Sequence, residues 1–486
     1  MADAPTPATL APRRAHAPER TLVGIVGGGP AGLLLSHLLH RSGVDHVVLE
    51  ARSREEIEHT HRAGILEAGA VQALVDAGLD RVLRDGSRHD GIVLRFDGAD
   101  HRIDLTGLTG RSVWLYPQTD VFIDLANQRA ADGAYSSGGG DGGGADGAGV
   151  GGAGVGGAGG VGDQVRWGAT VTHVLDGGSV VGGSGSGSGS SSSSSGGVGS
   201  VGGSVVASAV ASAGGGDRPG VLWTDRQGGT HELRCDVLVG ADGSHSTLRH
   251  TLPESQRRTF VHEYPYAWFG VIVETPRSAP ELVYTASEHG FALISQRTET
   301  HQRLYFQCDP DEDPNRWSDD QIWAELQRRV AGPDGFRLVE GPVEERSVLR
   351  FRSSVVEPVR HGRMLLAGDA AHTVPPTGAK GLNLALADVV VLHDVLLTWL
   401  AGDGRTGRRN DTVLDEYGRR VAERVWRAQH FSAWMSGMLH SHPGETDFAA
   451  RRRLAELRML VASESGRKFL AEGYTGWGPV LGEATP

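Results

Sequence analysis

The sequence predicts an α/β fold with mixed α+β character, and two regions carry that prediction. Near the start, an apolar strand at Thr21–Gly32 runs into glycines, a leucine-rich helix covers Leu33–Arg41, and a second strand covers Val44–Glu50. Strand, helix and strand in this order form a βαβ unit. Further along, aromatic and β-branched residues alternate over Glu263–Gln307, a pattern typical of a second sheet. Helices are expected over Leu384–Leu400, Asp415–His440 and Ala449–Ser463.

Low-complexity sequence interrupts the middle of the chain. Glycine makes up 72 of the 486 residues, about twice the usual share. Residues 136–162 are rich in Gly and Ala, and residues 177–216 are rich in Gly and Ser. Neither insertion can bury enough apolar surface to offset its ordering entropy, so we interpret both as flexible linkers within one β region. The strands of that region are expected at Gln164–Asp176, Gly220–Thr224 and Glu232–Val239.

The composition excludes several classes of protein. Mean hydropathy is −0.25 and no apolar run reaches about 18 residues, so no membrane span is expected. A net charge of −12 argues against a nucleic-acid-binding protein, whose affinity would need clustered Lys and Arg. Cys235 and Cys308 are too few for a disulfide framework, and no residues have metal-ligand spacing. Residues 1–20 contain a basic pair without a following apolar region, so we expect a disordered tail and a cytoplasmic protein.

A glycine-rich turn follows the first strand. Gly27-x-Gly29-x-x-Gly32 opens the first helix, and Glu50 ends the second strand. The first glycine permits the tight turn, the second lets the backbone approach a pyrophosphate, and the third lets helix and strand pack closely. The acid suits a ribose hydroxyl pair, and the helix N-terminus favours phosphate. This Rossmann-like pattern predicts a dinucleotide site, but it does not by itself separate FAD from NAD.

Two further glycine–acid motifs point to FAD. Gly368-Asp369 follows the apolar strand Met364–Ala367 and precedes a helix. A strand-end Asp can hold the ribityl or pyrophosphate side of a flavin, while the next helix presents its N-terminus to the isoalloxazine ring. The third motif is Val239–Ser244, an apolar strand that ends in Asp242-Gly243. Three such motifs in this order predict an FAD-binding protein.

Together these motifs resemble those of the single-component, FAD-dependent aromatic hydroxylases. The resemblance extends from Thr21 to about Gly478, apart from the two insertions. It implies an enzyme that uses NADH or NADPH and O2 to add a hydroxyl group to C3 of 4-hydroxybenzoate, through a flavin C4a-hydroperoxide. It also implies the product 3,4-dihydroxybenzoate and a homodimer. The stretches specific to hydroxybenzoate hydroxylases are HRAGILEAG at 61–69, YPQTD at 116–120, GFALISQR at 290–297 and residues 351–385.

The resemblance also implies how the chain is divided. An interleaved β-sheet substrate-binding domain is expected from residues 101–120 and 257–344, and a C-terminal helical region from residues 401–486. The FAD-binding domain is expected to be discontinuous and to consist of residues 21–100, 220–256 and 345–400.

The residues that the resemblance assigns to binding of the substrate carboxylate lie in GFALISQR and in the strand that follows it. A guanidinium group suits bidentate binding of a benzoate carboxylate, and the resemblance gives this role to Arg297. Ser295, two residues earlier, would add a hydrogen bond from the same face of the strand. Tyr305 would reach the same carboxylate, and Arg303 resembles a residue that contacts the flavin.

A hydrogen-bonded chain is implied for the phenol of the substrate. Tyr284 would accept a hydrogen bond from the phenol, and Tyr474 would extend the chain. His89 would pass the proton to solvent, because the pKa of a histidine lies near neutrality. The carbonyl of Pro376 would face the substrate hydroxyl, since proline keeps its acceptor. These residues lie far apart in the sequence, and only the resemblance links them.

The remaining cofactor contacts are likewise implied by the resemblance. Lys380 and Asn383 would lie on the flavin side, with Asn383 near the carbonyl edge of the ring. Gln118 and Arg62 would hold the pyrophosphate and the ribityl chain, and Arg352 would bind the nicotinamide nucleotide.

One departure from the family pattern concerns that nucleotide. NADPH-preferring members carry a Tyr and an Arg in the helix after the second strand, where this chain has Glu56 and Thr60. Glu56 and Glu58 would repel a 2′-phosphate, and Arg52 and Arg54 would compensate in part. We therefore expect NADH to be used at least as well as NADPH.

Two alternatives stay open. A sister hydroxylase of another hydroxybenzoate would keep the FAD motifs and Arg297 but would shift the phenol contacts. A flavin-binding redox or interaction protein without hydroxylase activity would lack the two tyrosines or Arg297, and all three residues are present.

Overall fold

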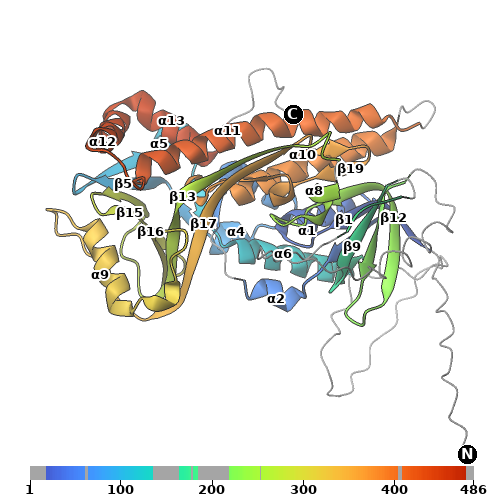
Figure 1. Cartoon of the computed structure of the whole chain (residues 1–486), viewed down its shortest axis with the longest axis horizontal. Coiled ribbons are helices and arrows are strands. Elements are labelled where there is room, and N and C mark those ends of the chain that lie inside the picture. Colours follow the sequence, from blue (N-terminus) through green and yellow to red (C-terminus); the bar gives the residue numbers. More distant parts are fainter. Residues whose placement is uncertain are drawn as a thin grey trace, which may run out of the picture.

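Two large sheets organise the computed structural model, which describes residues 18–60, 64–134, 164–176, 179–183, 218–251, 253–402 and 408–477. The nine-stranded first sheet lies at one end of the molecule and the eight-stranded second sheet at the other (Figure 1). The long paired strands β13 (Arg258–Glu274) and β17 (Val343–Glu357) extend from the second sheet toward the first. A small third sheet consists of β3 (Ile65–Glu67), β7 (Val113–Leu115) and β4 (Ser87–His89).

The first sheet has a parallel core of apolar, almost completely buried strands, as expected for a sheet that is covered on both faces. These strands are β8 (Val165–Trp167), β2 (His46–Glu50), β1 (Glu19–Val26), β12 (Thr230–Gly240) and β19 (Met364–Leu366). Antiparallel strands complete the sheet: β9 (Thr170–Asp176), β10 (Ser179–Gly183), β11 (Gly220–Thr224) and β18 (Arg360–His361).

The predicted βαβ unit is confirmed, since β1 and β2 are parallel neighbours joined by α1 (Pro30–Arg41). β1 begins at Glu19, so residues 19 and 20 belong to the sheet and not to the predicted tail. The predicted single strand over 164–176 is divided by Gly168, whose φ of +74° turns the chain between β8 and β9. The predicted insertion at 136–162 lies outside the described residues. Of the insertion at 177–216, residues 179–183 are described and pair with β9 as β10, so they are part of the sheet.

The second sheet confirms the strands predicted over Glu263–Gln307. Besides β13 and β17, its strands are β20 (His372–Thr373), β16 (His301–Cys308), β15 (Gly290–Gln296), β14 (Leu282–Ser287), β5 (Gly91–Phe96) and β6 (Ala99–Asp104).

The predicted domain boundaries at residues 100 and 345 do not follow the sheets. β5 pairs with β14, and β17 pairs with β13 as far as Glu357, so residues 91–100 and 345–357 lie in the second sheet. Alternating apolar residues predict a strand, but its partners are decided by tertiary packing.

The two faces of the second sheet pack on different elements. One face, with Phe269, Ile294 and Phe306, packs against the unpredicted helix α9 (Asp319–Val330). The opposite face packs against C-terminal helices. It carries several aromatic side chains, namely Tyr266, Trp268, Tyr284, Phe291 and Tyr305.

The predicted C-terminal helices are confirmed as α10 (Gly381–Ala401), α11 (Asp415–Leu439) and α12 (Asp447–Ala462), and α13 (Glu464–Thr475) follows them. Among the described helices, α10 has the length and apolar composition of a membrane span, but 56% of that stretch is buried inside the protein, where α10 contacts α1 and α11. The shorter elements are α2 (Arg54–Glu58), α3 (Ala68–Asp76), α4 (Arg81–Asp85), α5 (Leu105–Thr109), α6 (Gln118–Ala131), α8 (Thr247–Thr251), η1 (Pro314–Arg316), η2 (Gly368–Ala370), η3 (Pro376–Gly378) and η4 (Asp411–Leu414).

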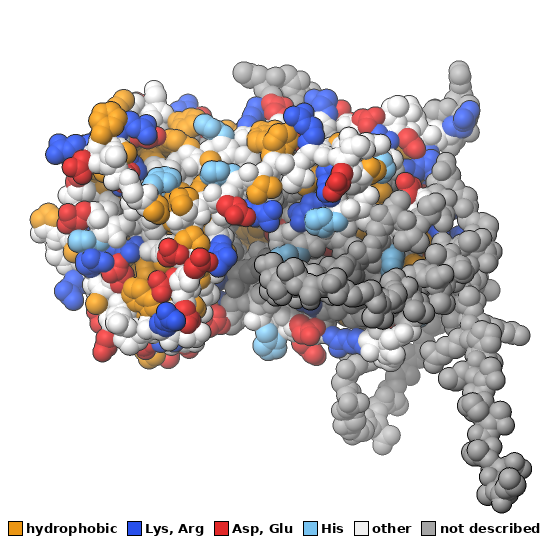
Figure 2. All heavy atoms as spheres, in the orientation of Figure 1, with side chains coloured by type: hydrophobic (Ala, Val, Ile, Leu, Met, Phe, Trp, Pro, Cys, Tyr) orange, Lys and Arg blue, Asp and Glu red, His pale blue; other side chains and the backbone are white. Residues whose placement is uncertain are grey.

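Charged side chains of both signs are mixed on the described surface shown in Figure 2, without a broad area of one sign. Within the part of the chain that the structure describes, no group of three or more His, Cys, Asp or Glu side chains could hold a metal ion.

Candidate active site

The glycine-rich turn after β1 leaves an open cradle. A side chain at Gly27 would put its Cβ 2.2 Å from the Ala241 carbonyl oxygen, and one at Gly32 would put it 1.9 Å from the Gly27 carbonyl oxygen. Gly29 differs, because a Cβ there would meet no described atom within 4 Å. α1 begins directly after Gly29, so free N–H groups and a positive dipole end border this open space. The turn therefore has the space and the polarity that a pyrophosphate needs.

Glu50 lies at the carboxyl end of β2, beside this turn. Its Oε2 accepts a hydrogen bond from the backbone N–H of Gly28 at 2.7 Å. Its Oε1 accepts one from the backbone N–H of Arg52 at 3.0 Å. Oε1 also accepts from the side-chain Nε–H of Arg52 at 3.3 Å, which uses both of its lone pairs, whereas Oε2 keeps one lone pair for a ribose hydroxyl.

The three glycine–acid motifs meet at one edge of the first sheet. β1, β12 and β19 are parallel neighbours, so the turns that follow them lie at the same edge. These turns contain Gly27, Asp242 and Asp369. The Oδ2 of Asp242 accepts from the backbone N–H of Thr247 at 2.7 Å and so holds the start of α8, and burial raises the pKa of Asp242. Open space, helix N-termini and acids at this edge fit FAD.

A buried pair supports the turn that carries Asp369. The Oδ2 of Asp388, on α10, accepts from the backbone N–H of Gly368 at 3.0 Å and lies 2.6 Å from Nε2 of His372. Burial lowers the pKa of His372, but the Asp388 carboxylate outweighs it, and the pKa is raised overall. The sequence analysis did not identify this pair, whose only signal is an acid within the apolar stretch NLALAD.

Lys380 lies in the loop after η3 and is buried. Its Nζ forms an ion pair with Glu67 of β3 and donates to the carbonyl oxygen of Tyr474 at 3.3 Å. The Nζ also lies 5.0 Å from the centre of the Phe431 ring and 5.4 Å from that of Trp477. Burial lowers the pKa of Lys380, and Glu67 opposes this effect. Glu67 was missed by the sequence analysis, although an acid in the apolar strand ILE is a visible signal.

Asn383 binds the same loop to β3. Its Oδ1 accepts from the backbone N–H of Glu67 at 2.9 Å, and its Nδ2 donates to the carbonyl oxygens of Ile65 and Ala379 at 2.8 and 2.7 Å. Ala379 has a φ of +54°, which is unfavourable for a residue with a Cβ and is maintained by these surroundings. The contact of Asn383 with a flavin ring stays a prediction.

Tyr284 and Tyr474, 190 residues apart in the sequence, come together between β14 and α13. Their hydroxyl oxygens are 2.6 Å apart, and each side chain is 1% exposed. Burial raises the pKa of both phenols, although the hydrogen bond between them opposes the rise at Tyr284. The predicted pairing of these two residues is present, and both are neutral at pH 7.

Arg297 lies in the turn just after β15, where its backbone N–H donates to the carbonyl oxygen of His301 at 3.0 Å. Its guanidinium is half-buried and forms no side-chain hydrogen bond or ion pair with another residue that the structure describes. Burial lowers the pKa of Arg297, and the nearby Arg303 lowers it further. A partly desolvated cation beside a second cation is suited to an anionic ligand.

Register brings the other predicted substrate residues to the same face. Ser295 is paired with Arg303, and Leu293, two residues earlier, is paired with both Tyr305 and Tyr284. Directly paired residues and residues two apart point to one face of a sheet, so all of them share it. The Arg303 guanidinium lies 5.4 Å from the centre of the Tyr305 ring, and burial raises the pKa of Tyr305.

His89 is not joined to the tyrosine pair by a direct contact. It is 2% exposed, and neither ring nitrogen has a hydrogen-bond partner among the described residues. Burial lowers its pKa, and the nearest charged groups are those of Glu281, Arg277 and Asp90. The predicted relay from Tyr474 to His89 therefore lacks a direct link in this part of the structure.

Three other predicted nucleotide-binding residues are Gln118, Arg352 and Arg62. Gln118 begins α6, Arg352 is exposed on β17, and Arg62 lies outside the described residues. Arg249, which the sequence analysis missed, lies near Arg352 and Asp369: burial lowers the pKa of Arg249, Arg352 adds to the effect and Asp369 opposes it.

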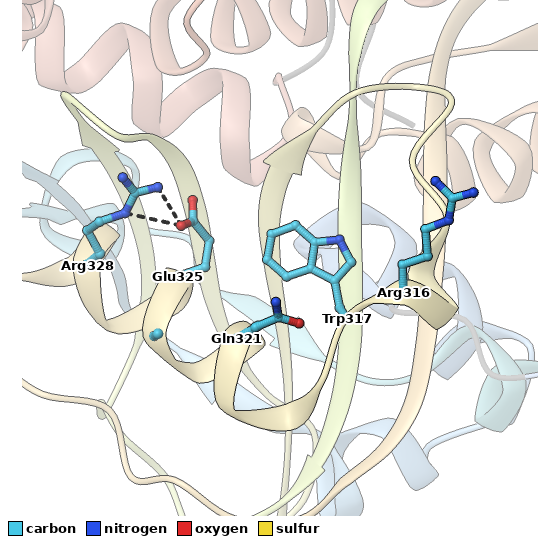
Figure 3. A pocket seen from close by; sticks show the side chains of 6 residues that line it. Arg316, Trp317, Gln321, Glu325 and Arg328 are labelled. Carbon is cyan, nitrogen blue, oxygen red and sulfur yellow. Dashed lines mark hydrogen bonds and ion pairs between the residues drawn. The ribbon is translucent and has the colours of Figure 1, made fainter.

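A surface depression of about 380 Å³ lies elsewhere, between Trp317 and α9 (Figure 3). Arg328 in its wall is paired with Glu325 at 2.5 Å. The Trp317 ring packs on Phe269 and Phe306, which belong to the α9 side of the second sheet. The depression is thus on the opposite face of the sheet from Tyr284.

Comparison with known proteins identifies the family of the chain. A family model described as an FAD binding domain matches residues 20–145 and 208–432. The chain is 35% identical over 460 residues to p-hydroxybenzoate hydroxylase of Acinetobacter baylyi, which covers 94% of this chain and 95% of that protein. It is 27% identical to the 3-(3-hydroxy-phenyl)propionate/3-hydroxycinnamic acid hydroxylase of Mycobacterium avium, over 94% of this chain and 66% of that protein.

Sequence, fold and site together define a flavoprotein aromatic monooxygenase. The chain belongs to the FAD binding domain family, as a member of the single-component, FAD-dependent aromatic hydroxylases. Among solved structures, p-nitrophenol 4-monooxygenase PnpA from Pseudomonas putida DLL-E4 has the same fold, with a TM-score of 0.65 at 18% identity over 95% of this chain and all of that one.

Proposed function

We propose that the protein hydroxylates 4-hydroxybenzoate at C3, with NADH or NADPH and O2 as co-substrates and 3,4-dihydroxybenzoate as product. The observation that carries the proposal is the shared face of β14, β15 and β16. Arg297 follows β15 directly, four residues along the chain from Leu293, the residue paired with Tyr284. A cation and a phenol-binding hydroxyl are the two groups that the polar ends of this substrate require.

Each residue on this face has a distinct task. Arg297 binds the carboxylate through a guanidinium fork, and the hydroxyls of Ser295 and Tyr305 add hydrogen bonds. Tyr284 accepts a hydrogen bond from the phenol and donates its own hydrogen to Tyr474, which polarises the phenol O–H bond and makes the ring carbon beside it more nucleophilic. FAD, when bound at the edge of the first sheet, supplies the hydride acceptor and the group that activates O2. The apolar side chains around the tyrosine pair exclude water from the reaction.

The test is a titration of purified holoenzyme with 4-hydroxybenzoate and its 2- and 3-hydroxy isomers, with product identified by chromatography. One 3,4-dihydroxybenzoate per nicotinamide nucleotide oxidised is expected with the 4-hydroxy isomer. Hydroxylation of another isomer would favour a sister hydroxylase. Nucleotide oxidation with hydrogen peroxide alone for all three isomers would refute the substrate assignment, and flavin without any turnover would favour a redox or interaction protein. Light scattering tests the homodimer, which would have twice the 51.3 kDa chain mass.

We also infer that NADH is used at least as well as NADPH, because the arginines around α2 are already paired with acids. Glu56 accepts from the backbone N–H of Ser53 in a capping box, so it is held at the start of the helix. Arg54, which could meet a 2′-phosphate, is paired with Glu58 at 2.6 Å. Glu56 is likewise paired with Arg226 at 3.3 Å, so a 2′-phosphate at this place would have to compete with these acids for the arginines.

The matched variants are Glu56→Gln and Glu55→Gln, which remove one charge each from the same turn of α2. Glu56→Gln keeps a side chain that can cap the helix and is expected to raise kcat/KM for NADPH severalfold relative to NADH. Glu55→Gln is the control, because Glu55 stands one residue away and was not assigned a role. A wild-type protein with a strong NADPH preference would contradict the inference.

A further inference from the structure

α11 carries a row of polar side chains on its buried face. Gln429, Ser432, Ser436 and His440 follow one another at spacings of three and four residues, so they lie along one side of the helix. Gln429 is 6% exposed and the other three are 0% exposed. Burying polar groups is costly unless they have hydrogen-bond partners, so their contacts indicate what the row holds in place.

Two members of the row bind the segment that leads to η3. The Nε2 of Gln429 donates to the carbonyl oxygen of Thr373 at 2.7 Å. The Oγ of Ser436 donates to Oγ1 of Thr377 at 2.8 Å. Thr377 is 0% exposed and directly follows Pro376, whose carbonyl oxygen already accepts from the backbone N–H of Ala379 at 2.9 Å. The Ser436 hydroxyl is thus one residue from the carbonyl predicted to face the phenol.

The last member of the row reaches the second sheet. The Nε2 of His440 accepts from the indole N–H of Trp268 at 2.7 Å, and its Nδ1 donates to the carbonyl oxygen of Ser436 at 2.9 Å. The His440 ring stacks on Phe291 of β15 at 4.2 Å, and the Trp268 ring lies 4.8 Å from that of Tyr305. Ser436 is therefore fixed against the sheet face that holds the predicted substrate residues.

We propose that Ser436 is a positioning residue: its hydrogen bond to Thr377 orients the Pro376 carbonyl toward the substrate phenol. Because Thr377 accepts the hydrogen bond from Ser436, rotation about the peptide that joins Pro376 to Thr377 is restrained. The segment is rigid on both sides, with Gln429 holding Thr373 before it and Asn383 holding Ala379 after it. This inference rests on the proposed function for the identity of the phenol.

Ser436→Ala and Ser432→Ala form a matched pair. Both serines are fully buried on α11, but the Ser432 hydroxyl has no hydrogen-bond partner among the described residues. In holoenzyme, hydrogen–deuterium exchange of a peptide that spans residues 373–379 is expected to be about fivefold faster in Ser436→Ala, the ratio for loss of one typical hydrogen bond. With saturating 4-hydroxybenzoate, that variant should also give severalfold less product per nucleotide oxidised, at an unchanged substrate Kd. Ser432→Ala should match the wild type in both measurements.

A double-mutant cycle with Thr377→Val isolates the hydrogen bond. If the bond is what matters, Ser436→Ala combined with Thr377→Val is no worse than either single variant, and Ser436→Thr, which keeps a hydroxyl, restores slow exchange. Exchange in Ser436→Ala equal to that in Ser432→Ala, or fully additive effects in the cycle, would overturn the proposal. Hydrogen exchange needs no turnover, so it tests the restraint by Ser436 even if the wild type does not hydroxylate 4-hydroxybenzoate. Absence of that hydroxylation in the wild type would refute the proposed function instead.

Discussion

Replacement of Tyr284 by Phe is the sharpest test of the proposed chemistry. The change removes the 2.6 Å hydrogen bond to Tyr474 and leaves that buried hydroxyl without its partner, at a cost of about 1–3 kcal/mol in folding free energy. Tyr474→Phe removes the same bond from the other side, so the two variants should lose similar stability. They differ in chemistry, because only Tyr284 is proposed to touch the substrate phenol.

Loss of a side chain that assists proton transfer typically slows such a step by about 10²–10⁴-fold. Tyr284→Phe should therefore bind 4-hydroxybenzoate with nearly unchanged Kd, oxidise the nicotinamide nucleotide, and release mostly hydrogen peroxide. Tyr474→Phe keeps the first hydroxyl and should lose less. The assay is product per nucleotide oxidised, with thermal unfolding of both variants as the control for stability. Wild-type coupling in Tyr284→Phe, or greater damage in Tyr474→Phe, would refute the role given to Tyr284.

Three further outcomes are expected. Arg297→Ala should weaken 4-hydroxybenzoate binding at least about 100-fold in a flavin absorbance titration. Two charge-assisted hydrogen bonds of about 1.5 kcal/mol or more each are lost. A change in Kd below threefold would exclude a carboxylate contact. Gly29→Ala should leave the apoprotein folded but weaken FAD binding, since its Cβ fills only open space. Gly69→Ala, where the space is also open, is the control and should leave both folding and FAD binding unchanged. Equal FAD affinity in both variants would contradict a pyrophosphate at Gly29. The free energy of unfolding should fall steeply above pH 10. Burial raises the pKa of seven tyrosines, so the unfolded chain loses protons that the folded protein keeps. Each tyrosine lowers the free energy of unfolding by up to about 1.4 kcal/mol per pH unit between its unfolded and folded pKa. Urea unfolding at pH 9 to 11 measures this, and a flat profile would be inconsistent with buried neutral phenols.

The local parts of the site were predictable because each depends on a short stretch of sequence. Strand, glycine turn and helix at Gly27–Gly32 follow from residues that are neighbours in the chain. In the structure, this glycine pattern leaves open space at Gly29, as the sequence predicted for a turn that the backbone of a dinucleotide site needs. The same holds for the turn at Asp369, which comes directly after an apolar strand.

The pairings across the fold were not predictable from residue patterns. The contact between Tyr284 and Tyr474 joins a strand to a helix 190 residues later, and only resemblance to a family pointed to it. Lys380 with Glu67, and Ser436 with Thr377, are set by how α10 and α11 pack on the sheets. In the sequence alone, each of these residues is as well explained by an exposed charge or by a serine within a helix as by a role in the site. The pairing of β5 with β14 was not predictable for the same reason, because the two strands lie far apart in the chain.

The position of Tyr474 explains why the two halves of the site depend on each other. Its hydroxyl contacts Tyr284 of the second sheet, while its carbonyl oxygen accepts from Lys380 in the loop at the FAD edge. The Lys380 cation is buried, and among the described residues only Glu67 forms an ion pair with it. Because Glu67 belongs to β3, this ion pair also holds β3 in place. A shift of α13 would therefore move the phenol-binding hydroxyls and the cofactor loop together. α13, which was predicted only as part of the C-terminal helical region, would thus couple the proposed substrate contacts to the predicted cofactor contacts.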